Sequence, residues 1–192
     1  MNYFLHQNDV TVDLKSNTAT FHNNLSESWK ITLLDTGLNT MTGGRIKKAK
    51  QYLTEPFMLT YGDGLCDVNI NHLLDFHTGH GKIVSMTSVQ PEGRFGLIKI
   101  ADENSVSSFN EKVKGDGGWI NGGYFICQPE MLDYISDDQT IFERVPLEKL
   151  AEEKQLQALK HSGFWKCMDT LRDKRELEEM WNNSNAPWKV WK

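Results

Sequence analysis

Hydrophobic and polar residues follow two different periods along this chain, and the change from one to the other predicts its elements. Near the start, Val10, Val12 and Leu14 alternate with polar residues, and Ile31 and Leu33 repeat the pattern. Because successive side chains of a strand point to opposite faces, both segments are predicted to be strands with one exposed face. The first part of the chain is therefore expected to be β-structure.

Beyond residue 40 apolar residues also recur at three- and four-residue spacing, which is typical of helices that bury one face. Helices are predicted from 43 to 53, from 70 to near 80, around 131–135, at 141–150 and at 171–181. Strands are predicted at 57–60, 83–89, 95–100, 106–109, 119–127 and 156–161. Strands that alternate with helices favour an α/β fold with a mainly parallel or mixed sheet and covered faces.

One predicted strand ends in a carboxylate held between two glycines. The apolar residues 57–60 are followed by Tyr61-Gly62-Asp63-Gly64, where glycine permits a sharp exit and the close approach of a bulky ligand. Ligands of open α/β sheets bind beyond the carboxyl ends of the strands, which is where Asp63 is expected. A turn carboxylate after a core strand would give the same pattern, so both interpretations stay open.

A second acid, Asp169, stands where the apolar segment 165–168 meets the last predicted helix. Mg²⁺ is commonly held by one or two carboxylates together with substrate phosphate oxygens and water, so Asp63 and Asp169 could share one ion. The alternative is that Asp169 is the N-cap of the helix that follows.

Residues between the two acids could contact a phosphorylated sugar. Glu111 could accept hydrogen bonds from sugar hydroxyls while Lys112 meets a phosphate, and the glycine-rich residues 117–124 would open the backbone to the same ligand. Arg94-Phe95-Gly96 could join an anion ligand to a tight backbone approach. An exposed Glu-Lys pair and a surface turn are the structural alternatives.

The segment Thr42-Gly43-Gly44-Arg45 precedes a predicted helix, so its backbone amides could face a base or a phosphate. It is not a Walker A loop. Neither GxxxxGK[ST] nor GxGxxG occurs in the sequence, so a P-loop or dinucleotide-binding function lacks its phosphate cradle.

Composition limits the remaining possibilities. The 192 residues suffice for one sizeable domain, predicted to span 1–192, and the net charge of −5 argues against a nucleic-acid partner. Three widely spaced cysteines indicate neither a disulfide framework nor a zinc ribbon, which favours a reducing compartment. No apolar run or leader pattern indicates a membrane segment, so a cytoplasmic location is expected.

Two clusters of charged or titratable residues are expected to be structural rather than functional. The basic cluster from Arg45 to Lys50 and the histidines His72, His77 and His80 are both expected to lie on solvated helix faces, rather than to bind nucleic acid or a metal. Asp63 and Asp67 do not form the acid-x-acid signature of many nucleotide-sugar glycosyltransferases, so that class is the less favoured alternative.

Taken in order, a set of motifs resembles the glucose-1-phosphate cytidylyltransferases of the sugar nucleotidyltransferase superfamily over essentially the whole chain. The motifs are TGGRIKKA, FMLTYGDG, DFH, PEGRFG, SFNEK, GWINGGYF, GFWKCMDTLRDK and APWKVW. The resemblance implies a Rossmann-like mixed sheet of the nucleotide-diphospho-sugar transferase type, N-terminally truncated, with a small β-ribbon and a C-terminal helical region.

The resemblance also implies an activity: the making of CDP-glucose from CTP and glucose 1-phosphate, for the dideoxysugars of bacterial surface polysaccharide such as the lipopolysaccharide O-antigen. The implied site residues fall into three groups. Asp63 and Asp169 would bind Mg²⁺ and, with Lys112, act in catalysis. The sugar and its phosphate would contact Gly96, Glu111, Lys112, Asn121 and Gly122. The other substrate-binding residue outside the glycine segment would be Tyr61, and the nucleotide would lie near Thr42, Gly43, Gly44 and Arg45.

One departure from the family pattern matters most. The family begins with a strand and a glycine-rich loop ending Gly-Thr-Arg, then a Lys-Pro segment, which together bind the triphosphate; neither is present in this sequence. The chain thus resembles about the final three quarters of such an enzyme, and a non-catalytic remnant or an oligomeric partner is the alternative. The resemblance implies a homo-oligomer, with a hexamer as the expected form, and Trp181, Trp188 and Trp191 are predicted to pack at a subunit contact.

Overall fold

The computed structural model describes residues 9–22, 29–91, 97–100, 105–110 and 118–191. The chain divides into two compact units, residues 1–35 and 36–192, and each is described by itself. The prediction of a single domain over residues 1–192 remains a prediction.

The first unit contains an antiparallel hairpin of β1 (Val10–Asp13) and β2 (Thr18–Phe21), which confirms the first predicted strand. Its turn is fixed by the Asp13 carboxylate, which accepts a hydrogen bond from the amide of Lys15 at 2.8 Å. The strand predicted around Ile31 and Leu33 is wrong. Both side chains are largely exposed and residues 29–35 pair with no strand among the described residues, because alternation alone does not supply a partner.

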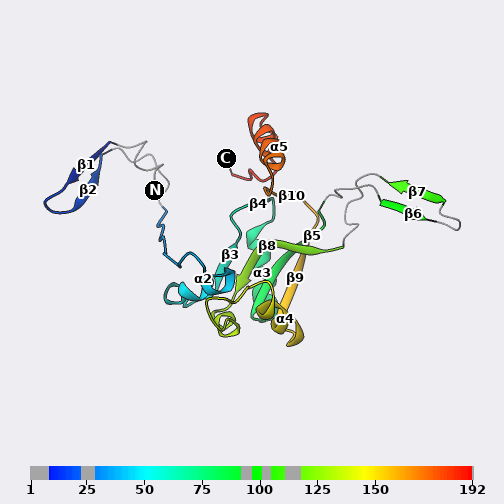
Figure 1. Ribbon diagram of the computed structural model, residues 1–192, viewed down its shortest axis with the longest axis horizontal. Coiled ribbons are helices and arrows are strands. Elements are labelled where there is room, and N and C mark those ends of the chain that lie inside the picture. The colour runs from blue at the N-terminus through cyan, green and yellow to red at the C-terminus, as the bar shows by residue number, and fades with distance from the viewer. Residues whose placement is uncertain (1–8, 23–28, 92–96, 101–104, 111–117, 192) are drawn as a thin grey trace. The chain divides into compact units, whose positions relative to one another are not determined.

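The second unit is built on a mixed sheet of four strands in the order β3 (Phe57–Thr60), β8 (Ile120–Cys127), β5 (Val84–Val89) and β9 (Leu156–His161) (Figure 1). The strand β8 runs antiparallel to both of its neighbours, whereas β5 and β9 are parallel. The predicted mixed α/β sheet is confirmed, and β9 has the predicted bounds.

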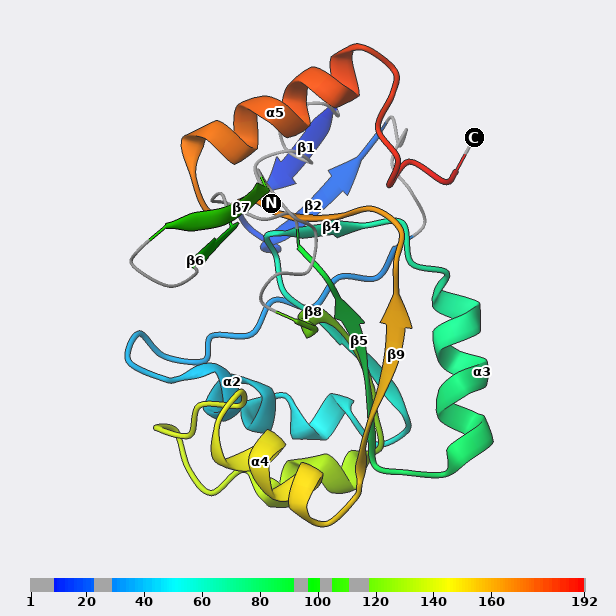
Figure 2. The same cartoon turned by 90° about the vertical axis from the view of Figure 1, so that its right-hand side faces the viewer.

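Helices cover both faces of this sheet (Figure 2). On one face lies α3 (Ile70–His80), which ends at Gly81 in the left-handed conformation. The opposite face packs against α2 (Thr42–Lys48), η1 (Lys50–Tyr52), η3 (Pro129–Tyr134) and α4 (Val145–Glu152).

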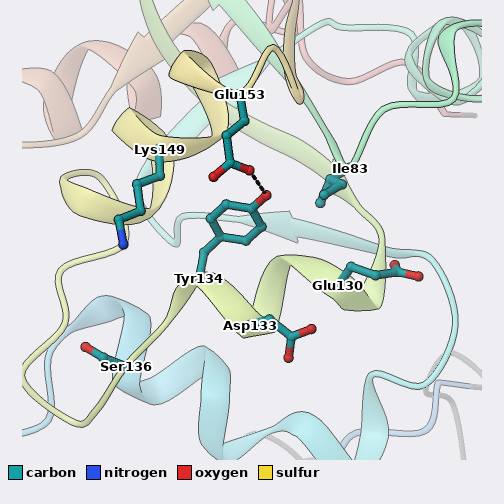
Figure 3. A pocket seen from close by; sticks show the side chains of 7 residues that line it. All are labelled: Ile83, Glu130, Asp133, Tyr134, Ser136, Lys149 and Glu153. Atoms are coloured by element: carbon teal, nitrogen blue, oxygen red, sulfur yellow. Dashed lines mark hydrogen bonds between the residues drawn. The ribbon is translucent and has the colours of Figure 1, made fainter.

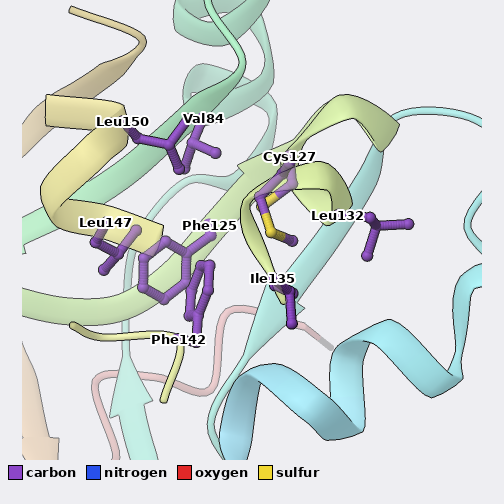
Figure 4. Packing of buried hydrophobic residues seen from close by; sticks show 9 residues of the cluster. Val84, Phe125, Cys127, Leu132, Ile135, Phe142, Leu147 and Leu150 are labelled. Carbon is purple, nitrogen blue, oxygen red and sulfur yellow. The ribbon is translucent and has the colours of Figure 1, made fainter. Parts of the chain in front are cut away.

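The main core forms between the sheet and the second of these helical layers (Figure 4). Phe125 and Phe142 meet edge to face with ring centroids 5.5 Å apart, and both are fully buried. The other buried members are Val84, Cys127, Met131, Leu132, Ile135, Leu147 and Leu150. The core therefore fixes β3, β5 and β8, the strands whose ends approach the predicted site.

Two short antiparallel pairs extend from the sheet. One joins β4 (Gly64–Cys66) to β10 (Trp165–Cys167), neither of which was predicted as a strand. The other joins β6 (Leu97–Ile100) to β7 (Val106–Asn110) and is the predicted β-ribbon.

The C-terminal helix α5 (Leu171–Asn182) forms as predicted. Trp188 is only 9% exposed and packs on Phe164, with ring centroids 5.3 Å apart, so its predicted place at a subunit contact is wrong. Trp181 and Trp191 are about half exposed, and their role in assembly stays a prediction. Within the described part of the chain, no helix combines the length and apolar character that crossing a membrane requires.

A buried polar network joins α3 to the sheet and contradicts the solvated histidine face. His77 is 1% exposed. The amide of Lys82 donates to Nδ1 of His80 at 2.9 Å, so Nε2 of His80 carries the proton and donates to the Ser85 hydroxyl at 2.7 Å. The side-chain amide nitrogen of Gln128 donates to Nε2 of His77 at 2.9 Å, so Nδ1 of His77 carries the proton and donates to the same Ser85 hydroxyl at 2.8 Å. Both rings are therefore neutral in this arrangement.

This network predicts a loss of stability in mild acid. Burial lowers the pKa of both His77 and His80, and a positive charge on His80, once protonated, would lower the pKa of His77 further. The unfolded rings protonate near pH 6.5, so below about that value the unfolded state binds protons that the folded state excludes. We expect the free energy of unfolding, measured in urea, to fall as the pH decreases from about 7.5 to 5.5.

The variant His77→Gln should show a smaller decrease over the same range, because it removes one titrating ring. The exposed His72→Gln is the matched control and should keep the wild-type slope. Equal slopes in His77→Gln and the wild type would contradict the prediction.

Candidate active site

The pairing of β4 with β10 brings the two predicted metal ligands to neighbouring strands. Gly64 lies opposite Cys167, and the amide of Met168 donates to the carbonyl of Asp63 at 2.8 Å. Asp63 thus directly precedes one strand and Asp169 closely follows the other, and both residues are exposed. Two carboxylates held in this way can reach a ligand from adjacent positions.

Asp169 is not the N-cap of α5, so that alternative is wrong. Thr170 is the N-cap: its side chain accepts from the amide of Asp173, and the Asp173 carboxylate accepts from the amide of Thr170 at 2.9 Å. This capping box already serves the first turn of the helix. Asp169 instead accepts a hydrogen bond from the thiol of Cys167, with Sγ and Oδ2 3.1 Å apart.

Two side-chain hydrogen bonds anchor the β4–β10 pair to the strand β8. Tyr124 donates its hydroxyl to the carbonyl of Gly64 at 2.7 Å, and the indole of Trp165 donates to the carbonyl of Gly122 at 2.8 Å. Lys166 forms an ion pair with Glu176 of α5, which lowers the pKa of that carboxyl. The pair is therefore tied both to the central sheet and to the last helix.

A further set of contacts joins the end of β9 to the same pair. Nε2 of His161 lies 2.8 Å from the Asp67 carboxylate and 3.2 Å from the carbonyl of Phe164, which also accepts from the amide of Asp67. We call this set the Asp67–His161 clasp. A Cβ at Gly163 would lie 2.4 Å from Oδ1 of Asp67 and 2.7 Å from the His161 ring, so any other residue there would force these two side chains to shift.

Three of the predicted substrate-binding residues meet through a residue that the sequence did not single out. The carboxylate of Glu143 accepts from the hydroxyl of Tyr61 at 2.8 Å and from that of Thr42 at 2.7 Å. The side-chain amide of Asn121 donates to the Tyr61 oxygen at 3.1 Å, and its carbonyl oxygen accepts from the amide of Gly123 at 2.8 Å. Glu143 thereby connects α2, β3 and β8.

The electrostatics of Tyr61 indicate that the Glu143 network lies close to Asp63. Burial raises the pKa of its phenol well above the usual value, and the negative charge of Glu143 raises it further. Asp63 adds a smaller effect of the same sign. The Tyr61 hydroxyl is therefore protonated in the ordinary pH range and lies within the electrostatic reach of Asp63.

The glycines at the start of α2 serve packing in this structure. The amides of Gly43 and Gly44 both donate to the carbonyl of Thr140, at 3.0 and 3.3 Å, and a Cβ at Gly44 would lie 2.7 Å from backbone atoms of Asp138. The expectation that these amides face a ligand is therefore not met, because a close approach of the chain to itself uses them. Any nucleotide contact of residues 42–45 must come from other atoms.

The basic residues around Arg45 are likewise engaged within the chain. Arg45 donates to the Thr36 hydroxyl at 2.6 Å, and Lys48 forms an ion pair with Asp138 at 2.6 Å. Lys47 donates to backbone carbonyls of residues 135 and 136. The cluster is thus not a plain solvated face, since it ties α2 to neighbouring loops.

Three predicted residues, Gly96, Glu111 and Lys112, lie outside the described residues. A hollow of about 490 Å³ between η3 and α4 contains none of the predicted site residues (Figure 3). Acidic side chains dominate its lining, and Tyr134 donates to Glu153 within it. It is unsuited to an anionic ligand such as a nucleotide, which favours the region around Asp63 as the functional site.

Comparisons with known proteins identify the family to which this chain belongs. Residues 14–178 match the family model described as nucleotidyl transferase. The solved structure of UDP-glucose pyrophosphorylase complexed with UDP-glucose superimposes on this chain with a TM-score of 0.57. The match covers 78% of this chain and 64% of that one at 13% identity, so it supports the fold alone. The chain belongs to the nucleotidyl transferase family, a family of enzymes.

Closer relatives narrow the group. The glucose-1-phosphate cytidylyltransferase of Salmonella typhi is 47% identical over 192 residues, which cover 99% of this chain and 74% of the relative. The probable glucose-1-phosphate cytidylyltransferase of Bacillus subtilis is 42% identical over 86% of this chain and 65% of its own length. Within the family, the chain belongs with the glucose-1-phosphate cytidylyltransferases, as its motifs indicate.

The Asp67–His161 clasp predicts a strong effect of one added methyl group. Gly163→Ala should lower the free energy of unfolding by about 1–3 kcal/mol, because Asp67 and the His161 ring must move apart to admit the Cβ. Urea unfolding monitored by tryptophan fluorescence measures this change.

The control is Gly79→Ala, since a Cβ there would meet no atom within 4 Å and the residue lies inside α3. That variant should gain roughly 0.5–1 kcal/mol from helix propensity. A neutral Gly163→Ala would contradict the importance of the clasp.

Proposed function

We propose that this chain carries the cytidylyltransferase site that its close relatives are named for: transfer of the cytidylyl group of CTP to glucose 1-phosphate, with release of pyrophosphate. The observation that carries the proposal is the β4–β10 pair. It holds Asp63 and Asp169 beside the ends of two paired strands, and both acids are exposed. The hydrogen-bonded network of Tyr61, Asn121 and Glu143 begins two residues before Asp63.

Mg²⁺ is the metal that this donor set fits. Asp63 and Asp169 offer carboxylate oxygens, the ligands that Mg²⁺ prefers, and their exposure leaves coordination positions for phosphate oxygens and water. When bound, the ion would offset phosphate charge and orient the reacting groups. Little covalent chemistry is required of the protein itself, because the sugar phosphate attacks the α-phosphorus directly.

The residues of the chain then act mainly by positioning. Lys112 would hold the attacking phosphate, Glu111 would accept hydrogen bonds from the sugar hydroxyls, and Gly96 would line the glucose pocket with residues 121 and 122. The Tyr61 hydroxyl donates to Glu143 and accepts from Asn121, so its role is to fix the Asn121 amide rather than to transfer a proton. Arg45 and the other residues from 42 to 45 are assigned to the nucleotide side.

The setting follows from the substrates. CTP and glucose 1-phosphate are soluble anions of the cytoplasm, so we place the reaction there, with CDP-glucose supplied to dideoxysugar synthesis for the O-antigen of lipopolysaccharide. Exposed Trp181 and Trp191 are suited to a homo-oligomeric contact, and a hexamer is the proposed form.

One segment of the family pattern is absent from these 192 residues. The 192 residues contain no glycine-rich loop ending Gly-Thr-Arg and no Lys-Pro segment after it, and the chain covers 74% of the Salmonella typhi relative. Such a loop supplies preorganised backbone donors to the triphosphate. Turnover of the 192 residues with and without that loop measures what it contributes.

The metal pair gives the first functional prediction. In a chimera that joins the preceding N-terminal segment of the Salmonella typhi relative to residue 1, Asp63→Asn or Asp169→Asn should lower Mg²⁺-dependent pyrophosphate release by about 10²-fold or more, because each removes an anionic ligand. Circular dichroism should remain unchanged, since both side chains are exposed.

Asp75→Asn is the matched control, because Asp75 is an equally exposed carboxylate on α3. It should turn over like the parent. Near-normal rates in either site variant would remove that aspartate from the metal role.

The polypeptide of 192 residues by itself should form little CDP-glucose. Losing a single oxyanion donor costs about 10² to 10³ in rate, and the loop supplies several donors, so turnover should be at least about 10²-fold below that of the chimera. The purified chain is incubated with CTP, glucose 1-phosphate and Mg²⁺, and the product is quantified by chromatography. Equal turnover would mean that residues 42–45 or another subunit provide a triphosphate site.

A further inference from the structure

Three side chains of different chemistry converge where β4 and β9 end. Cys66 closes β4, Asp67 follows it, and His161 closes β9. The thiol sulfur, a carboxylate oxygen and a ring nitrogen all lie within 4.8 Å of one another, and all three residues are half-buried. We propose that Cys66, Asp67 and His161 form a site for a transition-metal ion of the zinc class, separate from the magnesium site of the proposed function.

The chemistry of the donors selects this class of ion. Zn²⁺ binds thiolate sulfur, imidazole nitrogen and carboxylate oxygen, whereas Mg²⁺ takes oxygen ligands almost exclusively. Three protein ligands leave a fourth tetrahedral position for water. Asp63 and Asp169, by contrast, offer oxygen donors and suit the harder ion.

The distances are compatible with small side-chain adjustments. Metal–ligand bonds of about 2.0–2.3 Å place the ligand atoms of a tetrahedral site roughly 3.3–3.8 Å apart. Oδ1 of Asp67 and Nε2 of His161 are now 2.8 Å apart and must separate slightly, while no pair of ligand atoms is more than 4.8 Å apart and the widest pair must therefore close by at most about 1.5 Å. Both changes lie within the reach of side-chain rotations.

The backbone around the cluster holds the ligands in place. The backbone amide of Asp67 donates to the carbonyl of Phe164. Gly163 has no side chain, and a Cβ at this position would lie only 2.4 Å from the Asp67 carboxylate. The site is therefore framed by the end of β9 and both strands of the β4–β10 pair. A bound ion would join these segments by coordination in addition to hydrogen bonds.

Binding also balances in protons. Nε2 of His161 faces two acceptors, the Asp67 carboxylate and the Phe164 carbonyl, so it carries a proton in the metal-free protein. The ion would take the place of this proton beside Asp67, with the ring N–H of His161 then on Nδ1, and it would displace the thiol proton of Cys66, which leaves to solvent. Phe164 keeps the amide of Asp67 as a hydrogen-bond donor.

Co²⁺ is the probe for this site, because a cobalt–thiolate bond gives a charge-transfer absorption that oxygen ligands do not. The full chain, stripped of metal, is titrated with Co²⁺ in excess Mg²⁺ and then with Zn²⁺. We expect one equivalent of Co²⁺ to give the thiolate band and Zn²⁺ to remove it. Cys66→Ser should abolish the band, and Cys66→Ser and His161→Gln should each weaken Zn²⁺ binding by about tenfold or more.

Two controls locate the ion. Cys167→Ser changes another half-buried thiol of the same strand pair, outside the cluster, and should keep the band. Asp63→Asn should also keep it, which separates this proposal from the proposed function. Loss of the band in Cys167→Ser with retention in Cys66→Ser would overturn the assignment.

A measurement on the unaltered chain covers the case in which a variant fails to fold. Zn²⁺ should protect Cys66 from alkylation, as mapped by peptide mass, while Cys167 stays as reactive as in the metal-free protein. Absence of a thiolate band, or equal alkylation of Cys66 with and without Zn²⁺, would leave only an Asp67–His161 ion pair and would overturn the proposal.

Discussion

The antiparallel pairing of β4 with β10 is the constraint on which the rest of the site depends. Two three-residue strands bury little surface and form few ladder hydrogen bonds, so they would be marginal alone. The structure compensates with side-chain ties from Tyr124 and Trp165, and with the clasp of Asp67 and His161. Because these ties come from β8 and β9, the positions of both acids are set by the buried core rather than by their own loops.

Much of the fold could be predicted because its signals are local. The periodicity around α3, the apolar run of β5 and the bounds of β9 each depend on residues close in sequence, and all three predictions agree with the structure. The segment around Ile31 and Leu33 has an equally clear local pattern but no partner strand among the described residues. Pairing is a long-range property that alternation alone cannot reveal.

The site was predictable only in part, for the same reason. Asp63 and Asp169 stand in recognisable segments at the ends of apolar runs, whereas Glu143 lies in no motif and acts through contacts to Thr42 and Tyr61. The only available signal for Asp67 and His161 was that each follows or ends a short apolar segment. The prediction for Gly43 and Gly44 failed because a local glycine pair resembles a ligand-binding loop, whereas these glycines accommodate the backbone of residues 138–140. A glycine shows that something approaches closely, not whether it is substrate or backbone.

The charges of the site favour the cations that the proposed function assigns to it. Burial, the negative charge of Glu143 and, less strongly, that of Asp63 raise the pKa of Tyr61, so negative charge gathers around this half-buried hydroxyl. A nucleotide and a sugar phosphate are themselves anions, and both would be repelled by these carboxylates alone. The proposed Mg²⁺ and Lys112 would offset the charge of these acids and of the phosphates. The half-buried cluster of Cys66, Asp67 and His161 would likewise be stabilised by a cation, but its sulfur and nitrogen donors are softer. The two proposed sites therefore follow from one property of this region: acids held together by backbone pairing require positive charge, and the donor atoms select which cation supplies it.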